Sequence, residues 1–322
     1  MTGSDTRAIR TYHEVADPGS EEIVAQIESQ GRRLAARLAS VGAVIAVASG
    51  KGGVGKSAVT ANLAAVLADS GLRVGAADAD LHGPTLARML GASRERLRVA
   101  DEGVLPALGA SGVRIMSMDL LLEAPDAPVR WRGPGAGAFA WQGVLETSTL
   151  RELLADTAWG ELDVLLLDLP PGTDRLSRIL EILPRLEATL LVTTPSEAAR
   201  AAVARSARLA REAGIARLGL VANMTAWRCP DCGRETALFL ADGAGRLAGE
   251  TGLPVWAEIP FDPRLASATD AGRPFIRVAP EAPASQALRD LAARLVSETL
   301  GPEAQPPEAQ PPEAQPPETR AP

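Results

Sequence analysis

The sequence contains few lysines, histidines, cysteines or aromatic residues. Only 3% of its 322 residues are aromatic, so a core must be built from alanine, leucine and valine. The 33 basic residues include only two lysines, Lys51 and Lys56, and arginine supplies the others. A lysine ammonium is a compact, strongly hydrated charge, whereas an arginine guanidinium is planar and delocalised. Two lysines in one short segment therefore indicate a task that needs the ammonium, and phosphate binding is such a task.

Other features that the sequence lacks argue against several classes of protein. No apolar run is long enough to span a bilayer, and no N-terminal apolar segment follows a positively charged stretch. With only two cysteines, we expect a cytoplasmic protein in which Cys229 and Cys232 serve as metal ligands rather than as a structural disulfide. The net charge is −7 and the arginines are scattered, so we expect no binding to nucleic acid or to a membrane surface.

Both lysines lie in a glycine-rich segment that fits the P-loop pattern G-x-x-x-x-G-K-[ST]. In this pattern backbone N–H groups hold the phosphates, the lysine reaches the terminal phosphates and the hydroxyl binds Mg²⁺. An apolar run at 44–48 precedes the segment and a helical pattern at 57–69 follows it, which is the order that anion binding requires. A glycine-rich turn without a ligand is the alternative. The predicted nucleotide-binding residues are Gly50, Lys51, Gly52, Gly53, Val54, Gly55, Lys56 and Ser57.

Polar residues at three further strand ends complete the predicted nucleotide site. Asp78 and Asp80 follow the apolar run at 73–77, and we expect them to face Mg²⁺ and the γ-phosphate, with a solvated turn as the alternative. Asp168 ends the run at 163–168 and has the placement of a Walker B aspartate that holds Mg²⁺. Asn223 follows the run at 217–222, and its amide can both donate to and accept from adenine. Lys51, Lys56 and Asp80 are the predicted catalytic residues.

The order of apolar and helical segments predicts an α/β fold. Apolar runs at 44–48, 73–77, 113–117, 163–168, 188–193 and 217–222 alternate with helical stretches, and a last strand is expected at 255–259. This alternation is typical of a mostly parallel central sheet with helices on both faces, the three-layer arrangement of P-loop NTPases. We expect a leader with a helix at 1–40, an ATPase domain at 41–300, and a disordered tail at 301–322 built from a Pro-Glu-Ala-Gln-Pro repeat.

The two cysteines form a C-x-x-C motif, Cys229-Pro230-Asp231-Cys232, followed by Gly233. Such a turn places two thiolates on one metal. A structural zinc ion and a [4Fe–4S] cluster both need four ligands, and only the two histidines, His13 and His82, could add to the set. We therefore expect a second copy of the chain to supply the missing pair. A redox dithiol, two unligated thiols and a zinc clamp are the alternatives.

Taken together, these motifs resemble the Mrp/ApbC family of deviant P-loop ATPases. The resemblance covers the P-loop, the stretches 78–85, 131–134 (Trp-Arg-Gly-Pro), 168–173 and 223–225, and the cysteine motif. Members are ATP-binding iron–sulfur cluster carriers. The resemblance implies a homodimer that holds one [4Fe–4S] cluster between two C-x-x-C pairs and transfers it to apo iron–sulfur proteins, with slow ATP hydrolysis timing the transfer. It also implies that Lys51 reaches the nucleotide of the partner subunit.

This sequence departs from the family pattern in three places. Asp174 and Arg175 stand where members commonly have Gly-Asp, so either Asp174 supplies that carboxylate one residue early or the carboxylate is lost. A short helical leader replaces the extra N-terminal domain of many bacterial members, and the glycine-rich stretch after the cysteines is looser, at 242–245. The rival interpretation is a partitioning or cell-division ATPase of the ParA/MinD type, which would not explain Cys229 and Cys232.

Overall fold

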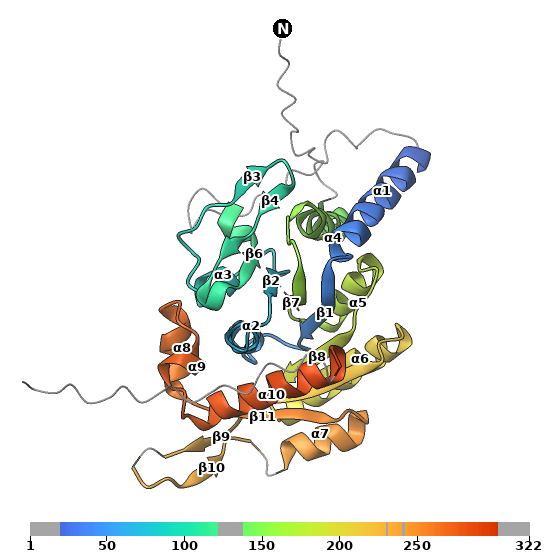
Figure 1. The fold of residues 1–322 in the computed structure, drawn as a ribbon. Coiled ribbons are helices and arrows are strands. Elements are labelled where there is room, and N and C mark those ends of the chain that lie inside the picture. The colour runs from blue at the N-terminus through green and yellow to red at the C-terminus, as the bar shows by residue number, and fades with distance from the viewer. Residues whose placement is uncertain (1–19, 122–137, 230, 240–241, 302–322) are drawn as a thin grey trace, which may run out of the picture.

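The computed structural model describes residues 20–121, 138–229, 231–239 and 242–301. In these residues a nine-stranded sheet forms the centre of the molecule (Figure 1). The strands lie in the order β10-β9-β8-β1-β7-β2-β6-β5, and β11 also pairs with β9. Their bounds are β1 (Val41–Ala48), β2 (Val74–Asp78), β5 (Ala107–Leu108), β6 (Arg114–Met116), β7 (Leu162–Asp168), β8 (Ala188–Thr193), β9 (Arg217–Arg228), β10 (Glu235–Ala237) and β11 (Val255–Phe261).

The sheet is parallel except at its two ends. β1 pairs in parallel with β7 and β8, β2 with β6 and β7, and β9 with β8 and β11. Among the described strands of this sheet, only β5 and β10 run antiparallel to their neighbours. Parallel strands place their carboxyl ends at one edge, where ligands of α/β proteins bind. The predicted mostly parallel sheet is therefore confirmed.

Helices cover both faces of the sheet, because the central strands are apolar on both sides. In β1, Ala43, Ile45 and Val47 enter one buried apolar layer, whereas the alternate residues enter the other. The first layer is covered by α2 (Lys56–Asp69), α3 (Leu86–Met89), α8 (Pro263–Asp270), α9 (Phe275–Val278) and α10 (Pro283–Thr299). The second is covered by α1 (Ser20–Leu38), α4 (Ala138–Asp156), α5 (Thr173–Ile182), α6 (Glu197–Glu212) and α7 (Gly243–Thr251).

The predicted leader helix forms as α1 and packs onto the sheet. Leu34 and Leu38 are fully buried in the same apolar layer as residues of α4, and the side chain of Gln30 donates to Glu152 on α4 at 2.7 Å. The predicted division into a leader, a domain and a tail remains a prediction. The repeat at 302–322 lies outside the described residues.

The runs predicted as strands all form strands, but several short strands have no signal in the sequence. A separate hairpin of β3 (Arg98–Ala100) and β4 (Gly103–Leu105) lies outside the main sheet, and two 3₁₀ turns occupy Ala110–Gly112 and Met118–Leu121. β9 continues past its predicted end to Arg228 and pairs there with β10. These additions are short and most of their residues are half-buried or exposed, so they lack the apolar runs that mark buried strands.

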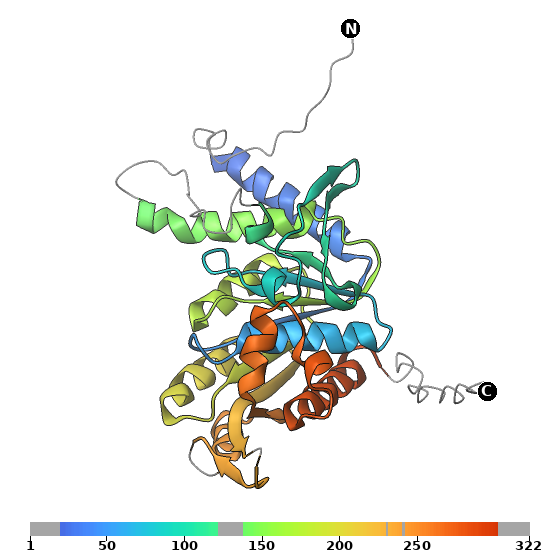
Figure 2. The ribbon, with the colours of Figure 1, turned by 90° about the vertical axis from the view of Figure 1, so that its left-hand side faces the viewer.

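The β9–β10 hairpin projects from the body at the end of the molecule opposite α1 (Figure 2). Within the described residues, no helix is both long and apolar enough to cross a membrane.

Candidate functional site

The predicted P-loop connects β1 to α2 at the carboxyl edge of the sheet. Gly55 immediately precedes α2 and has a left-handed backbone with φ of 82°. A Cβ at this position would lie 2.4 Å from Nδ2 of Asn223, and a Cβ at Gly50 would lie 2.5 Å from Cβ of Ala202 on α6. The loop is therefore held tightly from two sides and has no space for side chains at these positions. A glycine loop that leads into a helix N-terminus presents backbone N–H groups to an anion.

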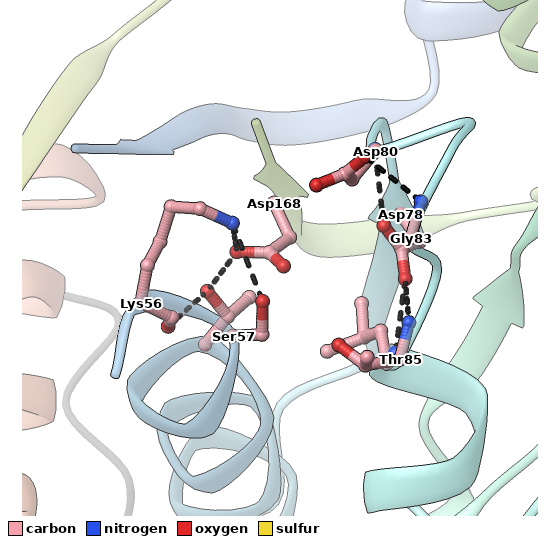
Figure 3. Close-up of polar contacts among 9 residues, drawn as sticks. Lys56, Ser57, Asp78, Asp80, Gly83, Thr85 and Asp168 are labelled. Carbon is pink, nitrogen blue, oxygen red and sulfur yellow. Dashed lines mark hydrogen bonds and ion pairs between the residues drawn. The ribbon is translucent and has the colours of Figure 1, made fainter. Parts of the chain in front are cut away.

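Lys56 lies at the first turn of α2 with its ammonium next to the end of β7. Its Nζ is 2.7 Å from Oδ1 of Asp168 and 3.3 Å from Oγ of Ser57. Thr60, one turn further along α2, donates to the same Oδ1 at 2.8 Å. Figure 3 shows Lys56, Ser57 and Asp168 converging on one place. The structure thus brings together the phosphate lysine, the hydroxyl and the Walker B aspartate that the sequence predicts.

The donor set around Asp168 fits a magnesium ion. Asp168 is fully buried, and its Oδ2 has no hydrogen-bond partner among the described residues. An unpaired buried carboxylate oxygen is costly unless a ligand satisfies it. Carboxylate and hydroxyl oxygens are the hard donors that Mg²⁺ prefers, and Ser57 supplies the hydroxyl at 3.3 Å from the Lys56 ammonium.

Asp78 and Asp80 shape the loop after β2. Asp78 is paired with Asp168 in the register of β2 and β7, and its Oδ2 accepts from the backbone N–H groups of Thr85 at 2.8 Å and Leu86 at 2.9 Å. Oδ1 of Asp80 accepts from the N–H groups of His82 at 3.3 Å and Gly83 at 3.1 Å. Both carboxylates therefore hold the 78–86 loop in shape, while their predicted contacts to Mg²⁺ and the γ-phosphate remain predictions.

The burial of Asp78 changes its ionisation. Burial, together with the nearby charge of Asp168, raises the pKa of Asp78 to about 7, although backbone hydrogen bonds from Leu86, Thr85 and Asp80 oppose the shift. Two carboxylates this close disfavour simultaneous ionisation. A cation placed between them would favour the ionised pair, as expected of a magnesium site.

Lys51 and Asn223 make their contacts at the rim of the P-loop. Nζ of Lys51 donates to Oγ of Ser196, in the connection between β8 and α6, at 3.2 Å. Nδ2 of Asn223 donates to the carbonyl oxygen of Val54 at 2.9 Å, so β9 braces the P-loop directly. The predicted roles, a partner's nucleotide for Lys51 and adenine for Asn223, remain predictions.

The cysteines lie on the exposed turn that joins β9 to β10. The N–H of Cys229 donates to the carbonyl of Arg234, and the N–H of Gly233 donates to the carbonyl of Cys229, both at 2.9 Å. Gly233 has φ of 70°, which a glycine adopts without strain. Cys232 is exposed and Cys229 is half-buried. The backbone of this turn therefore places both thiols at the tip of the hairpin.

The tip favours thiolate at Cys229. Hydrogen bonds from the backbone N–H groups of Cys232 and Asp231, and from the Cys232 thiol, lower the pKa of the Cys229 thiol. Thiolate is the form that binds metals. Within the described residues, no group of three or more potential metal ligands is placed around one point. His82, a possible extra ligand by sequence, bonds instead to Glu146, with Nε2 2.7 Å from Oε1. The predicted role of the two thiols as metal ligands therefore remains a prediction, since the described residues bring no third ligand to them.

Several functional contacts have little or no signal in the sequence. The one-turn spacing of Lys56 and Thr60 on α2 is the available signal for Thr60. The contact of Asn223 with Val54 joins residues 169 positions apart, and no local pattern predicts it. The Trp-Arg-Gly-Pro motif at 131–134, His13, Pro230 and the Asp174 side chain lie outside the described residues, so the choice at Asp174 remains open.

Comparison with known proteins assigns the chain to a family. A family model described as ParA: NUBPL iron-transfer P-loop NTPase matches residues 40–296. The chain belongs to this family. The resemblance that the motifs carry is thus confirmed at the level of the family, as is the P-loop NTPase fold.

Two relatives and one solved structure show how far the likeness extends. The iron-sulfur cluster carrier protein of Saccharolobus solfataricus is 36% identical over 84% of this chain and 88% of its own length. The cytosolic Fe-S cluster assembly factor NUBP2 of Bos taurus is 37% identical over 81% of this chain and 95% of its own. A nucleotide-binding protein of Archaeoglobus fulgidus, solved in complex with ADP, is 37% identical with a TM-score of 0.64 and covers 76% of this chain and 91% of its own.

Proposed function

We propose that this protein is an ATP-binding iron–sulfur cluster carrier. Two copies would hold one [4Fe–4S] cluster between their Cys229 and Cys232 thiolates and pass it to apo iron–sulfur proteins. The observation that carries the proposal is β9, which braces the P-loop through Asn223 and ends at the two-thiol turn. The names of the relatives, iron-sulfur cluster carrier and cytosolic Fe-S cluster assembly factor, support it. The second name also supports a cytoplasmic location.

The cysteine count supports a homodimer. A [4Fe–4S] cluster takes four thiolates, and each chain has two cysteines. Two copies meeting at their hairpins would complete the ligand set. The same meeting would bring each Lys51, at the rim of the P-loop, toward the other copy. The proposed role of Lys51 is to close over the partner's nucleotide.

The proposed reaction at the P-loop is hydrolysis of ATP to ADP and phosphate. A water oxygen would bond to the γ-phosphorus, the bond from that phosphorus to the bridging oxygen would break, and ADP would leave with that oxygen. One proton of the water would stay on the phosphate product and the other would pass to solvent. Lys56 and the loop N–H groups bind the phosphates, and Asp80 faces the γ-phosphate. Ser57, Asp78 and Asp168 would hold Mg²⁺, which neutralises phosphate charge when bound.

Nucleotide and cluster would be coupled along β9. The distance from Asn223 to Cys229 is six residues, at most about 20 Å for an extended strand. A change in the P-loop therefore reaches the hairpin through a single strand. Hydrolysis would alter the spacing of the two hairpins and so control release of the cluster.

The test is metal analysis of protein purified without oxygen, beside a Cys229→Ala, Cys232→Ala double variant. The proposal expects about four iron and four acid-labile sulfide per dimer, and neither in the variant, which should still bind nucleotide. Zinc in place of iron would leave a dimeric ATPase with a structural clamp. Protein without metal, in a monomer or dimer that still hydrolyses ATP, would favour the positioning ATPases instead.

A further inference from the structure

A buried carboxylate outside the predicted site contacts both segments that lead away from the site aspartates. Glu146 lies on α4, and its side chain is 9% exposed. Its Oε1 is 2.7 Å from Nε2 of His82, and its Oε2 accepts from Nη1 of Arg175. Nη1 of Arg178 lies 3.7 Å from the same Oε2. We call Glu146 with His82 and Arg175 the Glu146 bridge.

The bridge is an ionised carboxylate with a donor on each oxygen. Burial alone raises the pKa of Glu146, but hydrogen bonds from His82 and Arg175 and the charges of these residues outweigh it, so that the pKa is lowered. An ionised carboxylate only accepts hydrogen bonds, so Nε2 of His82 carries the proton of that contact. Charge-assisted bonds of this kind are stronger than neutral ones.

The two arms of the bridge reach two different segments of the nucleotide site. His82 lies two residues after Asp80, whose Oδ1 accepts from the N–H of His82. Arg175 lies in the first turn of α5, which follows the connection that begins at Asp168. Glu146 is thus a single carboxylate that joins the Asp80 loop to the segment after Asp168.

The helix that carries Glu146 is also anchored to α1. Leu150 and Leu154, further along α4, are buried in the apolar layer shared with α1. Glu152 on the same helix accepts from Gln30 of α1 at 2.7 Å. The bridge therefore ties two connecting segments to a fixed part of the core. Arg175, a departure from the family pattern, forms one arm of it.

We infer that Glu146 is a positioning residue for ATP hydrolysis: it holds the Asp80 loop and the first turn of α5 at a fixed spacing around the γ-phosphate. This inference rests on the proposed ATP hydrolysis. Because Glu146 acts through the loops, its loss should slow turnover more than it weakens nucleotide binding. Small displacements of groups around a reacting centre cost up to about 100-fold in rate.

The test compares Glu146→Gln with Glu152→Gln, a matched change on the same helix. Glutamine keeps the size of Glu146 but removes its charge and replaces one acceptor oxygen with an NH₂ donor, so both arms lose the charge that strengthens their hydrogen bonds. In Glu146→Gln we expect amide hydrogen exchange in 80–86 and 173–178 to rise about tenfold, while exchange in 51–57 stays unchanged. We expect kcat to fall about tenfold with KM within about threefold. Glu152→Gln should alter neither exchange in these segments nor kcat.

Hydrogen exchange keeps this inference separate from the proposed function. If the wild-type protein does not hydrolyse ATP, the proposed activity fails, yet the exchange comparison still decides whether Glu146 holds both loops. Equal exchange in Glu146→Gln and wild type, or equal loss of kcat in both glutamine variants, would overturn the inference. If Glu146→Gln does not fold, Arg175→Gln removes the hydrogen bond that Arg175 donates to Glu146 and keeps the contact of Glu146 with His82. It should then raise exchange in 173–178 and leave 80–86 unchanged.

Discussion

We call the P-loop with Asp168 and Asn223 the nucleotide end. The nucleotide end and the cysteine hairpin are joined by one strand, β9, but they differ in burial and in the number of contacts. At the nucleotide end, Lys56 is 7% exposed and Asp168 is fully buried, and the contacts come from α2, β7 and β9 of one chain. At the hairpin, Cys232 is exposed and the described residues offer no further ligand around the thiols. Within the described residues, a single chain therefore brings the predicted phosphate and Mg²⁺ residues together, whereas at the hairpin it places two thiols without a third potential ligand. Nucleotide binding should therefore persist when a single residue of the hairpin is changed.

The largest expected effect comes from removing one hairpin thiol. Cys232→Ala should abolish cluster binding, because both copies carry the change and only two of the four thiolates remain in the dimer. Since Cys232 is exposed, the free energy of unfolding should change by less than about 0.5 kcal/mol. Iron analysis, urea unfolding and nucleotide titration measure cluster binding, stability and nucleotide affinity. A loss of nucleotide affinity would show that the nucleotide end depends on the hairpin.

The matching change at the nucleotide end is Gly55→Ala. With φ of 82° and only 2.4 Å between a new Cβ and Nδ2 of Asn223, this methyl group must displace the amide that braces Val54. We expect nucleotide affinity to fall at least about 100-fold and stability by about 2 kcal/mol. Gly71→Ala is the control, since Gly71 has φ of 89° with open space around it. Gly71→Ala should lower the free energy of unfolding by about 1 kcal/mol and leave nucleotide affinity unchanged. Titration with a fluorescent nucleotide analogue measures the affinity of both variants.

Substitutions at the two lysines test whether the nucleotide end needs Lys51 from a second copy of the chain. Lys51→Arg keeps the charge but not the compact shape, so we expect turnover to fall at least about tenfold while nucleotide affinity stays within about threefold. Lys56→Arg should weaken affinity itself, because Lys56 is 7% exposed and a larger head group does not fit beside Asp168. Steady-state turnover and binding titrations separate the two effects. Unchanged turnover in Lys51→Arg contradicts the role across the dimer.

The buried carboxyl group of Asp78 predicts that the stability of the fold depends on pH below about pH 7. The pKa of Asp78 is about 7 in the fold, so between about pH 4 and pH 7 the folded protein holds a proton that the unfolded chain has released. Stability should therefore fall as pH rises through this window, by an amount on the order of 4 kcal/mol. Urea unfolding with EDTA and without nucleotide measures it. Asp78→Asn, whatever its own cost, should remove most of this slope. If Asp78→Asn kept the slope of the wild type, the proton would be bound by a group other than Asp78.

The sequence predicts the nucleotide end better than the contacts that position it. Lys56, Ser57 and Asp168 follow from motifs because each stands at the end of an apolar run or just beyond one, and parallel strands bring such ends to one edge. The bond from Asn223 to Val54 and the Glu146 bridge join distant segments through polar side chains without periodicity. The sequence does not predict the outer half of β9, for a different reason. It is exposed, with Trp227 and Arg228 on the surface, and so lacks an apolar run.

The smallest expected effect lies at Met224, where the two regions meet. Met224 has φ of 59°, unusual for a residue other than glycine. The pairing of β9 with β11 shifts register between Asn223 and Trp227, so β9 bulges immediately after it braces the P-loop. A bulge bends its strand and redirects the residues beyond it. The kink at Met224 therefore sets the direction of the hairpin.

Met224→Gly should change stability by less than about 1 kcal/mol, because relief of left-handed strain is offset by the greater entropy of the unfolded chain. Met224→Val should cost more, since a β-branched residue tolerates positive φ poorly. If the kink couples the nucleotide end to the hairpin, cluster retention in Met224→Gly should respond less to nucleotide than in the wild type. The variant should still bind nucleotide and cluster separately. Release of the cluster on nucleotide addition, followed by absorbance, measures this response. A response as large as that of the wild type would mean that β9 joins the two sites without transmitting changes between them.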